Sequence, residues 1–180
     1  MSQSEREVLW GRGFYTTDPG TLHRCVETNL YRVAKEMIAG GLVSVNARDR
    51  FDLTPLFYAA ENGRLKIAQL LLANGADPNA LNHRKELGGV SALTVAIQER
   101  HRMVARVLLV HGANPNGADR EGWVPLVDAA GNGDIAAVRM LLKHGANRKL
   151  KDWLGNTALS TAKSHKYRSI VALLRDRGVK

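Results

Sequence analysis

Gly75-Ala76-Asp77-Pro78-Asn79 occurs again as Gly112-Ala113-Asn114-Pro115-Asn116 and, in altered form, as Gly145-Ala146-Asn147-Arg148-Lys149. A leucine-rich stretch precedes each copy, such as Gln69-Leu70-Leu71-Leu72 before the first. The glycines that close successive units are 34, 37, 33 and 33 residues apart, at Gly41, Gly75, Gly112, Gly145 and Gly178. Repetition at this period predicts an array of about five structural units rather than one globular core.

One unit can be interpreted residue by residue. Thr54 is expected to cap a helix, and Pro55 suits the first helical position because its missing N–H is not needed there. Gly63 would end this helix in the left-handed conformation, and a second helix would run from about Leu65 to Ala73. A helix pair of this size cannot bury its apolar face alone, so neighbouring units must stack.

Three units lack the glycine that separates the two helices. Asn29, Arg100 and Lys166 take its place. Asparagine tolerates left-handed geometry, whereas Arg100 and Lys166 are expected to store strain of about 1 kcal/mol each.

These phrases resemble the ankyrin repeat family. The similarity rests on Thr54-Pro55-Leu56, on Ala59-Ala60-Glu61-Asn62-Gly63, and on Leu70-Leu71-Leu72-Ala73-Asn74-Gly75-Ala76-Asp77-Pro78-Asn79. It is weaker in the first unit, where Thr21-Leu22-His23 keeps only a trace of the helix-opening phrase. The resemblance implies an all-α fold, an ankyrin repeat solenoid of stacked helix-turn-helix units linked by β-hairpin-like fingers.

The predicted organisation is an N-terminal extension (1–14), a degenerate first repeat (15–48), three repeats (49–81, 82–118 and 119–151) and a C-terminal capping repeat (152–180). Arg175 replaces the apolar residue that ends the second helix elsewhere, so we expect it to face water at the end of the array. Extra residues between Ala80 and Lys85 lengthen one finger, either as a contact for a partner or as a neutral loop. The side chains expected to cover the first unit are Val8, Leu9, Trp10 and Phe14.

No combination of side chains predicts catalysis, a cofactor or a metal site. His111 and His144 recur at the repeat period, which indicates exposed structural positions rather than metal ligands. Cys25 falls where the other units have alanine, so we expect a packed core residue rather than a reactive thiol. The single cysteine and the absence of a signal-peptide pattern or long apolar run favour a cytoplasmic protein, with the nucleus or delivery into a host cell left open.

The resemblance also implies a function, since ankyrin repeat proteins hold other macromolecules with their fingers and their concave row of first helices. In this chain the fingers carry aromatic, aliphatic and arginine side chains, of which tryptophan and arginine dominate binding energy at interfaces. Two alternatives remain for Trp123 and Trp153, namely contact with a partner or packing between neighbouring fingers. The predicted protein-binding residues are Arg50, Phe51, Leu53, Glu61, Asn62, Leu87, Val90, Gln98, Glu99, Arg120, Glu121, Trp123, Asn132, Trp153, Leu154, Asn156, Ser164 and His165.

The charge is concentrated at one end. Residues 139–180 hold eleven basic and two acidic side chains, which together account for the net charge of +9. We expect a protein partner, and the basic end favours an acidic one. The alternative is an electrostatic binder of nucleic acid or of an anionic membrane surface, and a merely solubilising role is also open. By itself the protein is expected to be monomeric.

Overall fold

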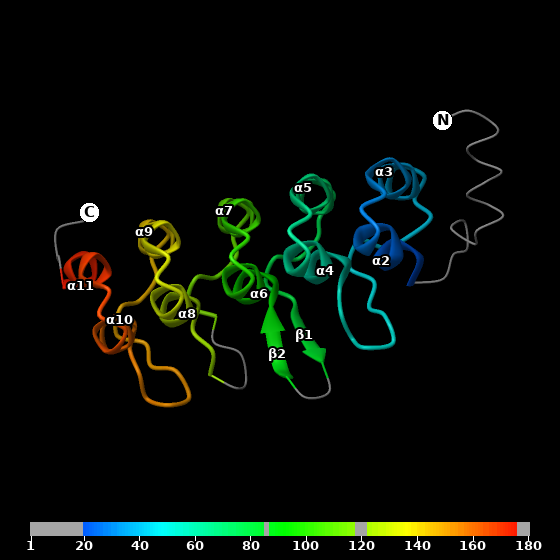
Figure 1. Cartoon of the computed structure of the whole chain (residues 1–180). Helices are drawn as coiled ribbons and strands as arrows, with labels where there is room; N and C mark the ends of the chain where they lie inside the picture. The colour runs from blue at the N-terminus through cyan, green and yellow to red at the C-terminus, as the bar shows by residue number, and fades with distance from the viewer. Residues whose placement is uncertain (1–19, 85–86, 118–121, 176–180) are drawn as a thin grey trace.

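The computed structural model describes residues 20–84, 87–117 and 122–175. Within these ranges the chain forms pairs of short antiparallel helices that stack side by side (Figure 1). This arrangement confirms the expected all-α solenoid of stacked units. The pairs are α2 (Gly20–Glu27) with α3 (Tyr31–Ala39), α4 (Pro55–Glu61) with α5 (Leu65–Ala73), α6 (Ala92–Gln98) with α7 (Arg102–Val110), α8 (Pro125–Gly131) with α9 (Ile135–Lys143), and α10 (Ala158–Ser164) with α11 (Arg168–Arg175).

The helices form two rows. The first helices of the pairs (α2, α4, α6, α8 and α10) make one row, and the second helices (α3, α5, α7, α9 and α11) make the other (Figure 1). The connections between pairs extend as fingers on the side of the first row. The position of the extension at 1–14 lies outside the described residues, and the exact repeat boundaries stay predictions.

Side-chain caps start most of the first helices. The Thr54 hydroxyl accepts the N–H of Phe57 at 3.2 Å, as predicted, and Pro55 occupies the first turn. Ser91 and Thr157 cap α6 and α10 in the same way. Because an N-cap satisfies a backbone donor that the helix leaves unpaired, each such residue fixes where its helix begins.

The left-handed positions between paired helices also follow the prediction. Gly63 and Gly133 have φ of +65° and +68°. Asn29, Arg100 and Lys166 adopt φ of 59°, 61° and 60° at the equivalent places. A residue with a Cβ atom is strained in this conformation, so the units containing Arg100 and Lys166 depart from the ideal repeat.

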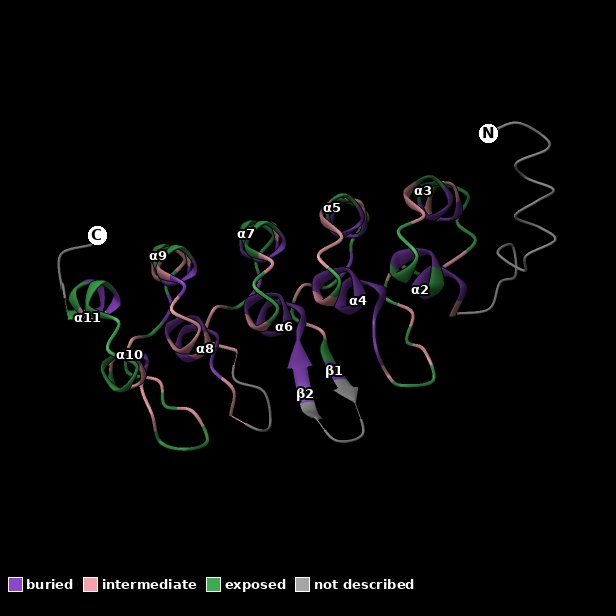
Figure 2. Ribbon diagram, in the orientation of Figure 1, coloured by how far each residue is buried: buried purple, intermediate pink, exposed green. Residues whose placement is uncertain are grey.

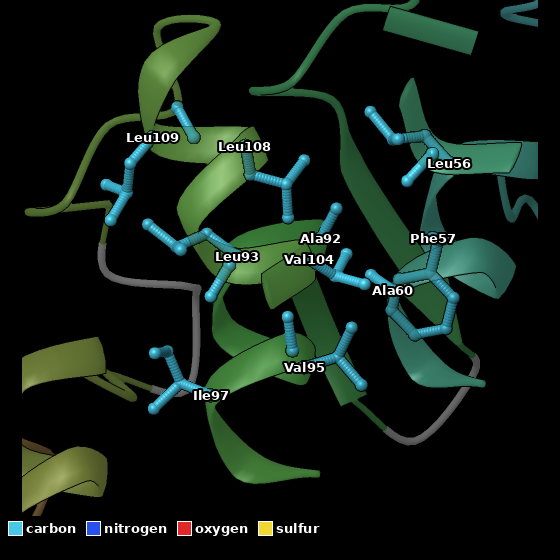
Figure 3. Packing of buried hydrophobic residues seen from close by; sticks show 14 of the residues in the cluster. Leu56, Phe57, Ala60, Ala92, Leu93, Val95, Ile97, Val104, Leu108 and Leu109 are labelled. Atoms are coloured by element: carbon cyan, nitrogen blue, oxygen red, sulfur yellow. The ribbon is translucent and has the colours of Figure 1, made fainter. Parts of the chain in front are cut away.

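A continuous apolar core lies between the two rows (Figure 2). Leu56 and Leu93 are buried on consecutive first helices, and Val104 and Leu108 of α7 pack in the same cluster (Figure 3). Arg175 is exposed, as predicted. Cys25 is fully buried, and this burial raises the pKa of its thiol to about 11, so the group is a core side chain at neutral pH.

A repeated set of asparagine hydrogen bonds joins successive units near the C-terminal ends of the second helices. Asn46 donates from Nδ2 to the carbonyl of Gly75 at 3.0 Å and accepts the N–H of Asp77 at 2.9 Å. Asn79 and Asn116 repeat both bonds with the next unit along. Lys149 occupies this position in the unit before the last. These bonds satisfy backbone groups of exposed turns and tie each unit to the next.

The extra residues after Ala80 form a two-stranded hairpin. Strands β1 (Leu81–Arg84) and β2 (Leu87–Ser91) pair antiparallel, so the predicted boundary at 81/82 falls inside β1. Asn82 is 1% exposed, and its Oδ1 accepts the N–H of Thr54 at 2.7 Å. Its Nδ2 donates to the carbonyls of Ala80 and Val90. The long finger is therefore tied to the finger before it, and whether it contacts a partner stays a prediction.

Candidate protein-binding surface

One groove collects many of the predicted binding residues. It lies between the first helices α6, α8 and α10 and the last two fingers, and its volume is about 460 Å³. We refer to it as the tryptophan groove. The predicted residues that line it are Gln98, Trp123, Asn132, Leu154, Asn156, Ser164 and His165. Its other lining residues are Val127, Asp128, Gly131, Asp152 and Thr161.

Hydrogen bonds between neighbouring units hold the polar wall of this groove. Gln98 Nε2 donates to Asp128 Oδ2 at 3.3 Å, which links α6 to α8. Asn132 Nδ2 donates to the carbonyl of Ile97 at 3.4 Å, and the Arg100 guanidinium donates to the carbonyl of Asn132 at 2.9 Å. Because these side chains are already held by hydrogen bonds, the protein loses little side-chain rotamer entropy when a ligand binds them.

Trp123 lines the groove, and it packs on Trp153, which is not itself among the lining residues. The rings of Trp123 and Trp153 meet edge to face, with centroids 6.4 Å apart and planes inclined by 62°. Trp123 is half-buried, whereas Trp153 and Leu154 are 60% and 61% exposed. A Cβ atom on Gly122 would lie 3.2 Å from the backbone nitrogen of Trp153, so this glycine allows the two fingers to approach. The tryptophans therefore pack on each other and still leave an apolar surface open to solvent.

The carboxylate of Asp152 stabilises the turn of the finger that carries Trp153. Asp152 Oδ1 accepts the N–H groups of Leu154 at 3.0 Å and of Asn156 at 2.7 Å. At the far rim the Ser164 hydroxyl donates to the carbonyl of Thr161 at 2.8 Å. The ring of His165 stacks on Tyr167, with centroids 5.6 Å apart and planes 10° from parallel. The exposed apolar residues thus stand on a structured turn beside a second aromatic pair.

A second set of predicted residues lies near α2 and α4, at the other end of the described array. Arg50 and Phe51 line a groove of about 600 Å³ beside α2 and α4, and the Arg50 guanidinium carbon lies 4.6 Å above the Phe51 ring. Glu61 and Asn62 lie next to Phe51 and Tyr58 at the end of α4. The sequence predicted one surface along all the fingers, and the structure divides it into two groups.

Asp49 organises the finger at this second place. Burial alone would raise the pKa of its carboxyl, but the N–H groups of Leu53 and Phe51 and the hydroxyl of Tyr58 donate to the carboxylate. These bonds favour the charged form and hold the pKa of Asp49 below its ordinary value. The finger that carries Arg50 and Phe51 is thereby fixed by an ionised side chain.

Two predicted binding residues are buried rather than exposed to solvent. Leu53 is 0% exposed and Val90 is 5% exposed, so the expectation that they contact a partner is wrong. Each comes directly before the N-cap residue of a first helix. At this point the finger returns to the stacked helices, and the side chains of Leu53 and Val90 belong to the apolar core. Trp123 and Asn156 occupy the same repeat position in later units and are half-buried.

The remaining predicted residues fall elsewhere. Glu99 is exposed at the C-terminal end of α6 and does not line the tryptophan groove. Leu87 lies in β2, and its side chain is outside the described residues, as are Arg120 and Glu121 altogether.

The sequence interpretation missed one position of the groove wall. Tyr58, Asp128 and Thr161 each come two residues after a leucine in the first turn of a first helix, and all three line a groove. A polar residue recurring there, between buried neighbours such as Val127 and Ala129, was a signal that could have identified the position.

Four of the described basic side chains of residues 139–175, Lys163, Lys166, Arg168 and Arg175, line a groove of about 430 Å³ at α10 and α11. Arg139 and Lys143 line a different groove. Among the described residues no group of three or more His, Cys, Asp or Glu side chains is placed to hold a metal ion. In the same part of the chain no helix has both the length and the apolar character needed to cross a membrane.

A family model described as "Ankyrin repeats (3 copies)" matches residues 22–119 and 93–180. The chain belongs to the ankyrin repeat family. Ankyrin repeats are in general protein–protein interaction modules, and the family is in general non-catalytic. The family assignment therefore agrees with the stacked helix pairs and with an exposed surface on the first row and its fingers.

Similar proteins come from bacteria and animals. This ankyrin repeat protein is 31% identical over 150 residues to "Putative ankyrin repeat protein YahD" of Escherichia coli (strain K12), which covers 80% of this chain and 72% of that one. It is 34% identical over 158 residues to "Putative ankyrin repeat-containing protein" of Treponema pallidum (strain Nichols), covering 88% and 51%. It is 33% identical over 155 residues to "B-cell lymphoma 3 protein homolog" of Mus musculus, covering 86% of this chain and 34% of that protein.

Proposed function

We propose that this protein is a non-catalytic adaptor, scaffold or inhibitor that holds a partner protein in the tryptophan groove. The observation that carries the proposal is the Trp123–Trp153 pair, in which Trp123 lines the groove and Trp153 packs on it, with Trp153 and Leu154 each about three-fifths exposed. A water-exposed indole beside an exposed leucine is unfavourable in a free monomer, and burying both against a partner gives a large hydrophobic gain.

The composition of the groove supports a protein as the occupant. Together with Trp123 and Leu154, the groove is lined by the carboxamide of Gln98, the carboxylate of Asp128 and the carboxamide of Asn132. Apolar anchors surrounded by fixed donors and acceptors match the centre and rim of a protein interface. The carboxylates of Asp128 and Asp152 in the lining disfavour a phosphate backbone at this place.

Comparative capture tests this function. The wild-type protein and a Trp153→Ala/Leu154→Ala double variant are immobilised and exposed to nuclease-treated lysate of the cells that produce the protein. Bound proteins are then quantified by mass spectrometry. We expect at least one protein to be retained by the wild type and reduced about tenfold or more on the double variant, because two central anchors are lost.

The matched control is Leu42→Ala, which removes an exposed apolar side chain (48% exposed) from the turn after α3. This variant is expected to retain the same protein as the wild type does. Equal capture by the double variant and the wild type would contradict the proposal. A parallel capture from untreated lysate completes the test. Proteins retained from untreated lysate but not from nuclease-treated lysate would instead favour the alternative function, electrostatic binding of nucleic acid.

A further inference from the structure

A further groove is lined by residues of α7 and α9. These two helices are neighbours in the row of second helices, on the side away from the fingers (Figure 1). The volume of the groove is about 520 Å³. We call it the outer groove. Its lining includes the apolar side chains of Met103, Val110 and Met140 and four cationic ones, Arg102, Arg106, Arg139 and Lys143. It shares no lining residue with the tryptophan groove.

The apolar part of the outer groove is open to solvent. Met103 is 55% exposed and Val110 is 66% exposed, and they lie two turns apart on α7. Met140 faces them from α9 and is half-buried against the core. Methionine side chains adapt to irregular apolar surfaces, so this floor suits the side chains of a protein segment.

Among the described residues, only one of the four cations that line the outer groove, Arg102, is paired with a carboxylate. The carboxylate of Asp134 lies beside the groove, but it is 4% exposed, accepts a hydrogen bond from Arg102 at 2.6 Å, and caps α9 by accepting the N–H of Ala137. Within the described residues, Arg106 and Arg139 make no ion pair, and both are exposed. The positive potential of the outer groove is therefore available to an external acidic group.

We propose that the outer groove binds an acidic amphipathic segment of a partner protein. Apolar side chains at helical spacing would contact Met103, Val110 and Met140, and flanking carboxylates would pair with Arg106, Arg139 and Lys143. The phosphates of a nucleic acid would pair with the cations, but its backbone has no side chains to bury against the apolar residues of the groove. A bilayer surface is flat on this scale and does not reach a recess between two helices.

The probe is a fluorescein-labelled synthetic peptide of about 15 residues, with leucines at i, i+3 and i+7 and glutamates at the other positions. Its binding to the full chain is measured by fluorescence anisotropy. Arg106→Glu/Arg139→Glu is expected to weaken binding at least about tenfold, and Met103→Ala/Met140→Ala about fivefold. The same peptide with glutamine in place of glutamate is expected to bind at least about tenfold more weakly.

The matched control is Lys35→Glu/Lys66→Glu, which makes the same change in net charge at exposed positions on α3 and α5. It is expected to change the affinity less than about twofold. Trp153→Ala should leave peptide binding unchanged, which separates this groove from the proposed function of the other one.

Methyl NMR locates the contact. The chain has four methionines, and the ε-methyl signals of Met103 and Met140 should shift on addition of the peptide. Met37 is 1% exposed in the core of the first pair, and its signal should stay in place. Four results would overturn the proposal. They are absence of saturable binding, an equal loss in the control variant, unshifted Met103 and Met140 signals, and equal affinity for single-stranded DNA or phosphatidylserine vesicles of matched charge.

Discussion

Leu108→Ala is expected to lower the free energy of unfolding by about 3 kcal/mol. Leu108 is 0% exposed and lies on α7 in the middle of the array, where it packs in one cluster with Leu93 and Val104 (Figure 3). Removing its branched end leaves a cavity that the surrounding helices fill only partly. Because each unit contacts only its neighbours, a weakened central unit loosens the array on both sides.

Urea denaturation followed by far-UV circular dichroism measures this loss. The control is Val110→Ala on the same helix, since Val110 is 66% exposed and its truncation should change the free energy of unfolding by less than about 0.5 kcal/mol. A loss below about 1 kcal/mol for Leu108→Ala would contradict the packing described above.

Trp153→Ala is expected to weaken partner binding about 30-fold, which corresponds to about 2 kcal/mol, and to change the free energy of unfolding by less than about 0.5 kcal/mol. The indole is 60% exposed in the free protein, so folding gains little from it and a partner can gain much. Trp123→Ala is expected to weaken binding as well, but also to lower stability by about 1 kcal/mol, because Trp123 is half-buried and packs on the Trp153 ring.

Isothermal titration calorimetry with the captured partner gives the affinities, and urea denaturation gives the stabilities. A Trp153→Ala protein that binds with wild-type affinity but unfolds more easily would show that the two tryptophans serve only to pack one finger on the next.

The repeat pattern was sufficient to predict the helices, because caps and left-handed positions act locally. Thr54 begins α4 and Gly63 ends it from their own backbone chemistry, and Lys166 adopts φ near +60° because it occupies the place of that glycine. Arg175 is exposed, as predicted from the arginine that replaces the apolar residue ending the other second helices.

The candidate site was predicted less well, because exposure depends on how a finger folds back on its neighbours. Leu53 looks like a finger residue in the sequence, yet it enters the core beside the cap of α4. Asn82 looks like part of a neutral loop, yet it is buried and holds the backbone of Thr54 in the previous finger. These contacts join residues about one repeat apart, and the pattern within one unit does not specify them.

The outer groove was also not predicted. Arg106 and Arg139 are one repeat apart in the sequence and belong to α7 and α9, which become neighbours only when the units stack. The sequence placed the excess charge at 139–180, whereas this groove also draws cations from α7, outside that segment.

Tryptophan fluorescence offers the most direct test of whether the exposed indole is the contact. The chain has three tryptophans, so a Trp10→Phe variant reports on Trp123 and Trp153 alone. When the captured partner is titrated into this variant, we expect the emission to shift to shorter wavelength and acrylamide quenching to fall, because Trp153 leaves water. Saturation seen by calorimetry with unchanged emission and unchanged quenching would show that the partner binds elsewhere on the protein.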